Sequence, residues 1–364
     1  MKLLSLFVLA LVLSACASSS AVEPIDDSAT LTSPTAPVIR TVSISGSGDV
    51  LTHSRQYNVA WNGKSYNFTK MFAPLQELLT QDINLCHLQT PLTKSPPSGY
   101  PVFSTPVTLA PALKAAGFDG CSLASNHTLD KGKSGALSTI RTMRNAGLTT
   151  FGTALNAKDS PVGWFLTDNG VKVAVLNYTY GLNGFRIPSD SPWLVNVINQ
   201  KKMLKAAKQA KTDGADIVLF SLHWGNEYWQ QASSSQKQLA RALTRSPFVD
   251  GIIGHHSHVF QETDVMNGKP VIYGLGNLWS GQGPWANLPL GQHGAIVTLN
   301  FEVEGKTVRY LDGTYVPTLT IKDTWVVQEA ATVRRNDQIG EACRSIRNAA
   351  KHLGQVLDGP RKCP

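Results

Sequence analysis

Three histidines follow the end of a short apolar run. The run contains Ile252 and Ile253, and the histidines are His255, His256 and His258. Imidazole nitrogens are common metal ligands in proteins, and on extended backbone the second and third of these histidines would share one face. The spacing therefore predicts two imidazoles that can bind one metal ion or a close pair of ions. The alternative is a polar turn whose histidines form only local hydrogen bonds.

Other candidate ligands follow other apolar segments. Asp49, Asn126 and His223 each come directly after a segment with the alternation or apolar content of a β-strand. Mixed Asp, Asn and His ligation suits Mn, Fe or Zn better than Ca or Mg alone. Two such metals close together can activate a water molecule and polarise a phosphoryl or carbonyl oxygen. One or two divalent ions are therefore predicted, with the ligands Asp49, Asn126, His223, His256 and His258.

A candidate proton donor lies next to one of these ligands. His127 follows Asn126 directly, and Asp130 is placed to orient its imidazole. Histidine titrates near neutral pH, which suits a group that donates a proton. His127 is therefore a candidate proton donor.

Predicted strands and helices alternate along the chain, as expected for an α/β fold. Parallel strands separated by helices place their carboxyl ends at one edge of the sheet. The expected core strands are residues 42–49, 83–91, 118–124, 148–152, 215–222 and the run that ends before the three histidines. The expected helices are residues 72–79, 109–116, 134–146, 196–212, 234–244 and 337–354. The candidate ligands should therefore meet at one edge.

The remaining segments suggest hairpins and one glycine-rich loop. Residues 162–166 and 171–177 flank a turn at Asp168, Asn169 and Gly170. Residues 259–311 are rich in strand signals, with turns at 267–268 and 304–305. The loop 274–277 could line the cleft, but it lacks the lysine of a phosphate-binding loop.

Composition allows a sizeable core and gives some information about partners. The chain has 364 residues, 42% of them hydrophobic and 16% charged, and a formal net charge of +8. The positive charge suits anionic partners such as wall polymers, phospholipid heads, acidic glycans or polyglutamate. The alternative is a generally basic surface without a dedicated partner. No nucleic-acid-binding motif is present, so nucleic acid is not an expected partner.

The start of the chain looks like a targeting segment. Lys2 precedes the apolar stretch 3–13, which is too short for a mature transmembrane helix. Residues 13–16, Leu-Ser-Ala-Cys, resemble the lipobox of bacterial lipoproteins, which implies cleavage before Cys16 and lipidation of its thiol. The alternative is an ordinary secretory signal with an incidental cysteine. The expected division is a signal peptide (1–15), a lipidated tether (16–38), one catalytic-type domain (39–320) and a C-terminal extension (321–364).

Four cysteines remain once Cys16 is set aside. An even number in an exported protein suggests two disulfides, for which three pairings are possible. We favour Cys86–Cys121, late in two neighbouring predicted strands, and Cys343–Cys363 in the C-terminal tail. Their spacing is unlike that of a zinc ribbon, so a cysteine metal site is not expected.

Six short blocks occur in order between residues 40 and 280. They resemble the successive blocks of the bacterial capsule-synthesis CapA family, which is associated with poly-γ-glutamate capsule biosynthesis. The blocks are residues 48–49, 88–91, 124–127, 223–228, 254–258 and 273–277. The resemblance implies a calcineurin-like metallophosphoesterase fold, a four-layer αββα sandwich with a dinuclear metal edge. It also implies that His127 donates a proton near the leaving group.

One block departs from the family pattern. The family usually has Asn-Leu-Glu-x-Pro where this chain has residues 87–91, His-Leu-Gln-Thr-Pro. Gln89 is neutral and would stabilise a dication less than a carboxylate would. The site could therefore hold one metal, bind weakly or be inactive. Spacing leaves open whether His255 or His256 is the ligand, and the possible accessory residues are Gln89, His87, His255, Asn277 and Asp130.

Two functions are consistent with these features. The first is a lipid-anchored, extracytoplasmic metal-dependent hydrolase of the cell envelope. Its substrate would be a small phosphoester, a peptide with a γ-glutamyl-type amide, or an anionic envelope polymer. The second is a non-catalytic protein of capsule-polymer assembly or export with a degenerate metal site.

Overall fold

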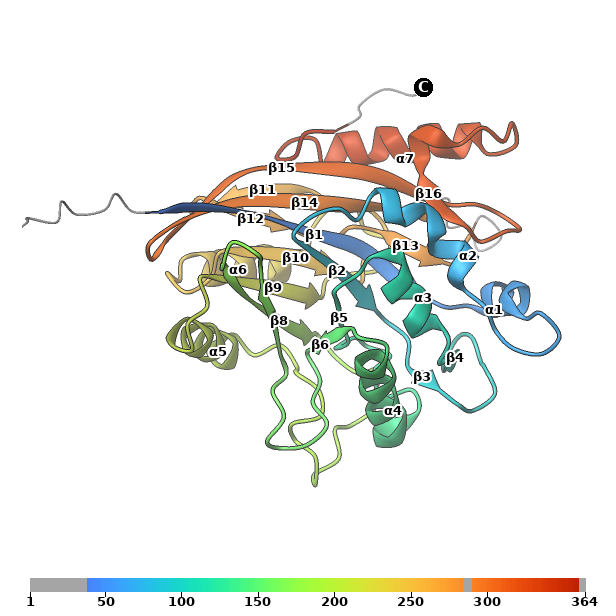
Figure 1. Ribbon diagram of the computed structural model, residues 1–364, viewed down its shortest axis with the longest axis horizontal. Coiled ribbons are helices and arrows are strands. Elements are labelled where there is room, and N and C mark those ends of the chain that lie inside the picture. Colours follow the sequence, from blue (N-terminus) through green and yellow to red (C-terminus); the bar gives the residue numbers. More distant parts are fainter. Residues whose placement is uncertain (1–37, 284–289, 360–364) are drawn as a thin grey trace, which may run out of the picture. The chain divides into compact units, whose positions relative to one another are not determined.

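Two β-sheets form the centre of the fold in the computed structural model, which describes residues 38–283 and 290–359 (Figure 1). The predicted signal peptide and Cys16 lie outside the described residues. Within the described part of the chain, no helix has the length and apolar character needed to cross a membrane.

The first sheet has eight strands in the order β16-β15-β14-β1-β2-β5-β6, and β13 also pairs with β1. Strands β1, β2, β5 and β6 are parallel to one another, whereas β14 and β15 run antiparallel to their neighbours. The strands are β1 (Ile39–Leu51), β2 (Ile83–Leu88), β5 (Gly120–Ser122), β6 (Thr149–Phe151), β13 (Asn277–Ser280), β14 (His293–Glu304), β15 (Thr307–Thr320) and β16 (Val327–Glu329).

The second sheet has six strands in the order β11-β12-β10-β9-β8-β7. Strands β8, β9, β10 and β12 are parallel, and the hairpin predicted around residues 168–170 is confirmed as β7 and β8. The strands are β7 (Val162–Leu166), β8 (Lys172–Thr179), β9 (Ile217–His223), β10 (Gly251–His255), β11 (Thr263–Met266) and β12 (Lys269–Ile272). A separate short pair joins β3 (Leu92–Thr93) and β4 (Thr105–Pro106).

Helices cover the outer faces of both sheets (Figure 1). Apolar residues of α2 (Thr69–Phe72), α3 (Leu109–Ala116) and α4 (Gly132–Asn145) share a buried cluster with the first sheet. Those of α5 (Gln200–Thr212) and α6 (Ser234–Thr244) pack on the second sheet. A third cluster, which includes Ile44 and Leu219, lies between the sheets. The order helices, sheet, sheet, helices confirms the predicted four-layer α/β sandwich.

The main differences from prediction lie at element ends and beyond residue 270. Helix α5 begins at Gln200 because the side chain of Asn199 caps it, accepting a hydrogen bond from the backbone N–H of Lys202. Strand β15 runs to Thr320, well past the predicted 311, because it pairs with β14 as far as His293. Strand β13 starts within the predicted glycine-rich loop. The short helix α1 (Ser54–Ala60) and the strand β16 were not predicted.

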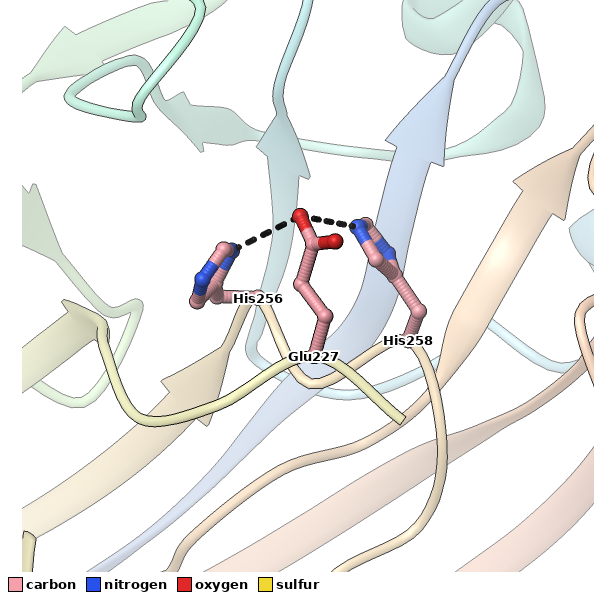
Figure 2. A group of neighbouring side chains, drawn as sticks. All are labelled: Glu227, His256 and His258. Carbon is pink, nitrogen blue, oxygen red and sulfur yellow. Dashed lines mark ion pairs between the residues drawn. The ribbon is translucent and has the colours of Figure 1, made fainter. Parts of the chain in front are cut away.

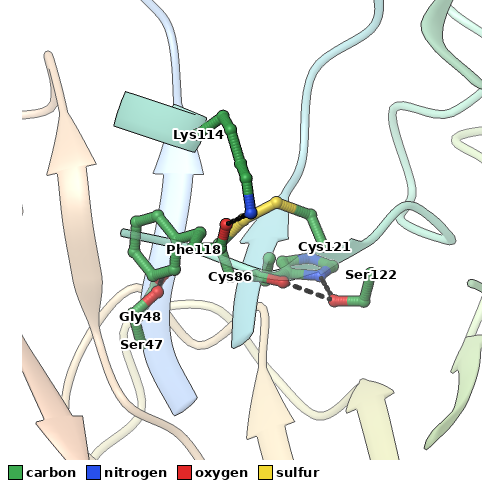
Figure 3. The surroundings of a disulfide bond; sticks show 8 residues. Ser47, Gly48, Cys86, Lys114, Phe118, Cys121 and Ser122 are labelled. Carbon is green, nitrogen blue, oxygen red and sulfur yellow. Dashed lines mark hydrogen bonds between the residues drawn. A yellow bond between two sulfur atoms is a disulfide. The ribbon is translucent and has the colours of Figure 1, made fainter. Parts of the chain in front are cut away.

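One of the two favoured disulfides lies within the described residues. Cys86 and Cys121 are directly opposite each other in the parallel pair β2 and β5, and their sulfurs are bonded (Figure 3). Cys343 lies in α7 (Ile339–His352), but Cys363 lies outside the described residues, so the second pairing stays a prediction.

Candidate metal centre

The carboxyl ends of strands from both sheets converge on one group of polar side chains. Asp49 of β1 is paired in register with His87 of β2, and His223 of β9 is paired with His255 of β10. The rings of His87 and His255 stack with centroids 4.2 Å apart, which joins the two sheets at this edge. The predicted meeting of these strand ends is therefore confirmed.

Asp49 is fully buried and accepts hydrogen bonds from the triple-histidine segment. One carboxylate oxygen lies 3.2 Å from Nδ1 of His255. The other accepts the backbone N–H of His256 at 3.0 Å and lies 3.3 Å from Nδ1 of His258. Burial raises the pKa of Asp49, but the hydrogen bonds to His255 and His258 and the nearby histidines lower it further, so the pKa lies well below its ordinary value. Asp49 is therefore ionised and can act as a metal ligand.

A second chain of contacts runs through the other predicted ligands. Nε2 of His87 lies 2.9 Å from Nδ1 of His223, and Nε2 of His223 lies 2.9 Å from Oδ1 of Asn126. Because the amide oxygen can only accept, Nε2 of His223 carries the proton and His87 donates to His223. The hydroxyl of Ser122 then donates to Nδ1 of His87 at 2.6 Å. Both imidazoles are held in defined tautomers, pointing at each other and at Asn126.

His256 and His258 lie in a turn and not on extended backbone, so the predicted strand geometry is wrong. Strand β10 ends at His255. The φ angle is 86° at His256 and 56° at His258. These values are in the left-handed region, which non-glycine residues rarely adopt and which is often found at functional sites. The turn still brings the two rings together, with centroids 5.9 Å apart.

Glu227 completes a possible metal-binding group with these two histidines (Figure 2). Its Oε1 lies 3.9 Å from Nδ1 of His256 and 3.8 Å from Nε2 of His258. One ligand atom from each residue falls within 4.8 Å of the others. Nδ1 of His258 also lies 2.9 Å from Oδ1 of Asn277, which fixes the ring. Two imidazole nitrogens and one carboxylate oxygen are therefore close enough together to bind one ion.

The donor groups present fit a divalent metal. A metal binds the neutral form of imidazole, and burial lowers the pKa of His87 and His223 well below the ordinary value and that of His256 to about 3. Nδ1 of His256 is buried and has no hydrogen-bond partner among the residues that the structure describes. A buried polar atom without a partner is costly, and a bound cation would satisfy it.

His258 differs from the other histidines. Burial lowers the pKa of His258, but its contacts with Asp49, Glu227 and Asn277 raise it further, so that the pKa lies above the ordinary value. The carboxylates of Asp49 and Glu227 thus place negative charge close to His258. Such a position also favours a metal cation.

His127 and Asp130 form the expected pair beside this centre. Nδ1 of His127 lies 2.8 Å from Oδ2 of Asp130, and the ring of Phe103 packs edge-on against the imidazole. The carboxylate of Asp130 also accepts the backbone N–H of Phe103 at 2.7 Å. These contacts hold Nδ1 and leave Nε2 as the nitrogen that can transfer a proton.

Two of the residues that line the centre were not predicted from the sequence. Glu227 follows His223 by four residues, within a block already noted, but it lies beyond the strand end. Tyr180 packs on His256 with ring centroids 4.5 Å apart. His53, four residues after Asp49, uses Nδ1 to accept the backbone N–H of Gly281 at 3.2 Å.

Glycines allow the backbones at this edge to approach closely. A Cβ atom at Gly48 would lie 2.6 Å from the carbonyl oxygen of Gly276. A Cβ atom at Gly254 would lie 2.0 Å from the carbonyl oxygen of Tyr273. Any other residue at either position would push apart the strands that carry Asp49 and the histidines.

Residues 43–282 match the family described as "Bacterial capsule synthesis protein PGA_cap". The chain belongs to this family. The match includes every candidate metal ligand discussed above, while β14, β15, β16 and α7 lie outside it.

Two similar curated proteins come from bacilli. The chain is 36% identical over 176 residues to "Capsule biosynthesis protein CapA" of Bacillus anthracis, covering 47% of this chain and 42% of that protein. It is 32% identical over 173 residues to "PGA biosynthesis protein CapA" of Bacillus subtilis, covering 47% and 45%. The matched segments therefore span less than half the length of these relatives.

Solved structures with a similar fold have low sequence identity to this chain. The calcineurin-like phosphoesterase YfkN of Bacillus subtilis is 14% identical with a TM-score of 0.48, covering 86% of this chain and 98% of that one. A phosphatase of Mycoplasma pneumoniae is also 14% identical with a TM-score of 0.48, covering 78% and 95%.

Proposed function

We propose that this protein is a metal-dependent hydrolase of the bacterial cell envelope. Its substrate would be a phosphoester or a γ-glutamyl-type amide, and its role would lie in capsule or poly-γ-glutamate metabolism. Membership of the capsule synthesis family and the name of the Bacillus subtilis relative support this biological setting.

The observation that carries the proposal is the convergence of acid, amide and imidazole groups at one buried edge. The carboxylate of Asp49 lies beside His255 and His258, and His223 lies beside Asn126. The contact between Asp49 and His255 joins residues that are 206 positions apart in the chain. A structural core gains little from so many buried polar groups, whereas a metal centre requires them.

The residues have distinct proposed roles. Asp49, Asn126, His223, His256 and His258 hold one or two ions of Mn, Fe or Zn, and Glu227 adds a carboxylate. When bound, such ions would activate a water molecule and polarise the scissile group. His127 gives a proton from Nε2 to the leaving group, while Asp130 holds the opposite nitrogen at 2.8 Å.

We also propose that lipid on Cys16 anchors the chain at an extracytoplasmic membrane face. The lipobox-like residues 13–16 support this assignment. The formal net charge of +8 suits an envelope location, where anionic polymers are present. Mass spectrometry of the protein from a bacterial membrane fraction tests it. A diacylglyceryl adduct on Cys16 is expected, and an unmodified thiol on a cleaved or intact chain would rule the anchor out.

Metal analysis combined with two variants tests the hydrolase. The protein is loaded with Mn, Zn or Fe and desalted. Its metal content is measured together with hydrolysis of bis-p-nitrophenyl phosphate and γ-glutamyl-p-nitroanilide. We expect His256→Ala to lose metal and activity, and His127→Gln to keep metal but lose activity by about 100-fold or more.

The two variants act as controls for each other, since only one of them removes a ligand. Less than about one tenth of a metal ion per chain after loading would contradict the proposal. Full activity in the presence of a strong chelator would contradict it equally.

One observation favours a second candidate function. Gln89 places a neutral amide where the family usually has a carboxylate, and a weaker centre would suit a non-catalytic protein of polymer assembly or export. Such a protein would bind the polymer equally well with chelator present and with His127→Ala. Loss of polymer binding on chelation would count against it.

A further inference from the structure

A groove with a volume of about 250 Å3 opens beside the C-terminal helix α7. Its lining residues are Leu290, Arg344, Arg347, Asn348 and Lys351. We call it the α7 groove. Three of its five lining residues are cations and none is an acid, so its charge is strongly positive.

The three cations lie on one face of the helix. Arg344, Arg347 and Lys351 are spaced by three and four residues, which places successive side chains about 5–6 Å apart. Among residues 38–283 and 290–359, one of these cations, Arg344, pairs with an acid, Glu341, at a distance of 3.9 Å. The side chain of Arg344 remains 52% exposed. Such a distant, exposed pair neutralises little of the charge.

The helix that carries these cations is fixed to the fold, where it lies beside β15 (Figure 1). Its opposite face buries Ala342, Ile346 and Ala349. The hydroxyl of Ser345 donates to the carbonyl of Thr318 at 3.2 Å. The cations are therefore presented from a rigid element, which lowers the entropy cost of binding a ligand.

The α7 groove is connected to the metal centre through the loop that carries Glu227. Gln230 in this loop donates a hydrogen bond from Nε2 to Oδ1 of Asn348 at 2.8 Å. Nδ2 of Asn348 is buried and has no hydrogen-bond partner among the described residues. The same side chain thus contacts the loop and lines the groove.

A second connection leads from Leu290 to His258. The next residue, Gly291, accepts a hydrogen bond from Nδ2 of Asn277 at 2.8 Å. Oδ1 of Asn277 lies 2.9 Å from Nδ1 of His258. Two separate paths of contacts therefore link the α7 groove to the metal centre.

We propose that the α7 groove binds a linear polymer with a carboxylate on each repeating unit and directs that chain toward the metal centre. The charge and the guanidinium groups, which pair with carboxylates through two hydrogen bonds, favour this occupant. The choice of a carboxylate polymer rests on the proposed function. The groove itself lies beyond residues 43–282 and is thus an addition of this chain to the family-matched segment.

Binding of a fluorescently labelled γ-glutamate oligomer to the full chain, measured by anisotropy with chelator present, tests the proposal. The test variant is Arg344→Gln/Arg347→Gln/Lys351→Gln. The matched control is Lys201→Gln/Lys202→Gln/Lys205→Gln, which removes three exposed cations from α5. We expect affinity to fall at least about tenfold in the test variant and less than about twofold in the control. Thermal melting confirms that both variants fold.

Three outcomes would overturn the proposal. Equal losses in the two triple variants would show attraction to net charge alone. Unchanged binding in the test variant would place the polymer elsewhere, and tighter binding of a polyphosphate of equal charge would reject the carboxylate polymer.

Hydrolysis of bis-p-nitrophenyl phosphate separates this proposal from the hydrolase. Groove-dependent polymer binding in a chain that hydrolyses nothing would support the groove and reject the hydrolase. Hydrolysis without groove-dependent binding would do the reverse.

Discussion

The side-chain amide of Gln89 donates a hydrogen bond from Nε2 to Oδ1 of Asn126 at 3.1 Å. Oε1 of Gln89 is buried and has no hydrogen-bond partner in the part of the chain that the structure describes. The same Asn126 oxygen also accepts from His223. Gln89 is neutral and would not balance the charge of a metal cation. Its hydrogen bond also engages the Asn126 oxygen that a metal would use.

Gln89→Glu should tighten metal binding and destabilise the metal-free protein. A buried carboxylate without a cation costs about 2–4 kcal/mol, and the new oxygen would face Oδ1 of Asn126. A bound divalent ion would reverse both effects. We expect metal affinity to rise at least about tenfold. Calorimetric titration gives the affinity, and urea unfolding with and without metal gives the free energy.

Gln338→Glu is the matched control for this variant. Gln338 is also buried, and neither Nε2 nor Oε1 of its side chain has a partner among the described residues, but it precedes α7. Its substitution should lower the unfolding free energy without any rescue by metal. If metal stabilised both variants equally, Gln89 would not be next to a metal site.

Asp49→Asn should abolish metal binding and leave the fold intact. The amide has the same shape but lacks the charge that faces His255 and His258. The variant should bind metal at least about 100-fold more weakly while its near-UV circular dichroism stays unchanged. Asp264→Asn, on the antiparallel strand β11, serves as the control that should bind metal normally. Normal metal content in Asp49→Asn would remove Asp49 from the ligand set.

The stability of the metal-free protein should fall as pH drops below 6.5. Burial, followed by the charge of Arg344, lowers the pKa of His293 from 6.5 to about 3. The unfolded chain therefore binds a proton between these values that the folded chain rejects. One such group lowers the unfolding free energy by about 1.4 kcal/mol for each unit by which the pH falls between these two values.

His293→Gln isolates this contribution. Urea unfolding at several pH values, with chelator present, should give a pH slope for the variant that is shallower by about one proton. The other buried histidines would still contribute to the remaining slope. An unchanged slope would show that His293 is protonated in the folded state.

Gly254→Ala should destabilise the protein and loosen the metal centre. The added Cβ would lie 2.0 Å from the carbonyl oxygen of Tyr273 and 2.6 Å from Nε1 of Trp224, so backbone must move. We expect the unfolding free energy to fall by about 2 kcal/mol or more. Gly181→Ala is the control, because a Cβ there meets no atom within 4 Å. Similar losses in both variants would contradict this account.

Removal of the Cys86–Cys121 disulfide should lower the unfolding free energy by about 3 kcal/mol. The bond joins β2 to β5 across a sequence separation of 35, which limits the freedom of the unfolded chain. Cys86→Ala/Cys121→Ala should therefore match the oxidised wild type in fold but not in stability. Wild-type protein treated with a reductant should unfold at the same urea concentration as the variant. A difference between these two would point to a packing effect of the alanines.

Much of the α/β layering could be predicted because its signals are local. The buried strands β9 and β10 are continuous apolar runs, and α6 has the predicted bounds 234–244 because Ser233 caps it. Strand β13 was missed because its identity comes from a long-range parallel pairing with β1, in which Asn277 lies opposite Asp49. No local pattern reports such a pairing.

The candidate ligands could be located at strand ends, but their geometry could not. His256 and His258 adopt positive φ angles that side-chain spacing does not reveal. Glu227 was missed because it reaches the histidines from a loop, four residues beyond His223. Strand-end reasoning finds the groups that the sheet positions and overlooks those brought in by loop conformation.

The pairing of β14 with β1 has a consequence for any shortened version of this protein. The family match ends at residue 282, yet β1 is hydrogen-bonded to β14 from Ile39 opposite Glu304 to Ser47 opposite Ile296. A chain cut after residue 282 would leave the backbone amides and carbonyls along that edge without partners and expose the apolar side of Ile44. Such an open strand edge is a template for self-association. The matched segment alone is therefore expected to self-associate through β1, whereas the chain that retains β14 keeps this edge paired.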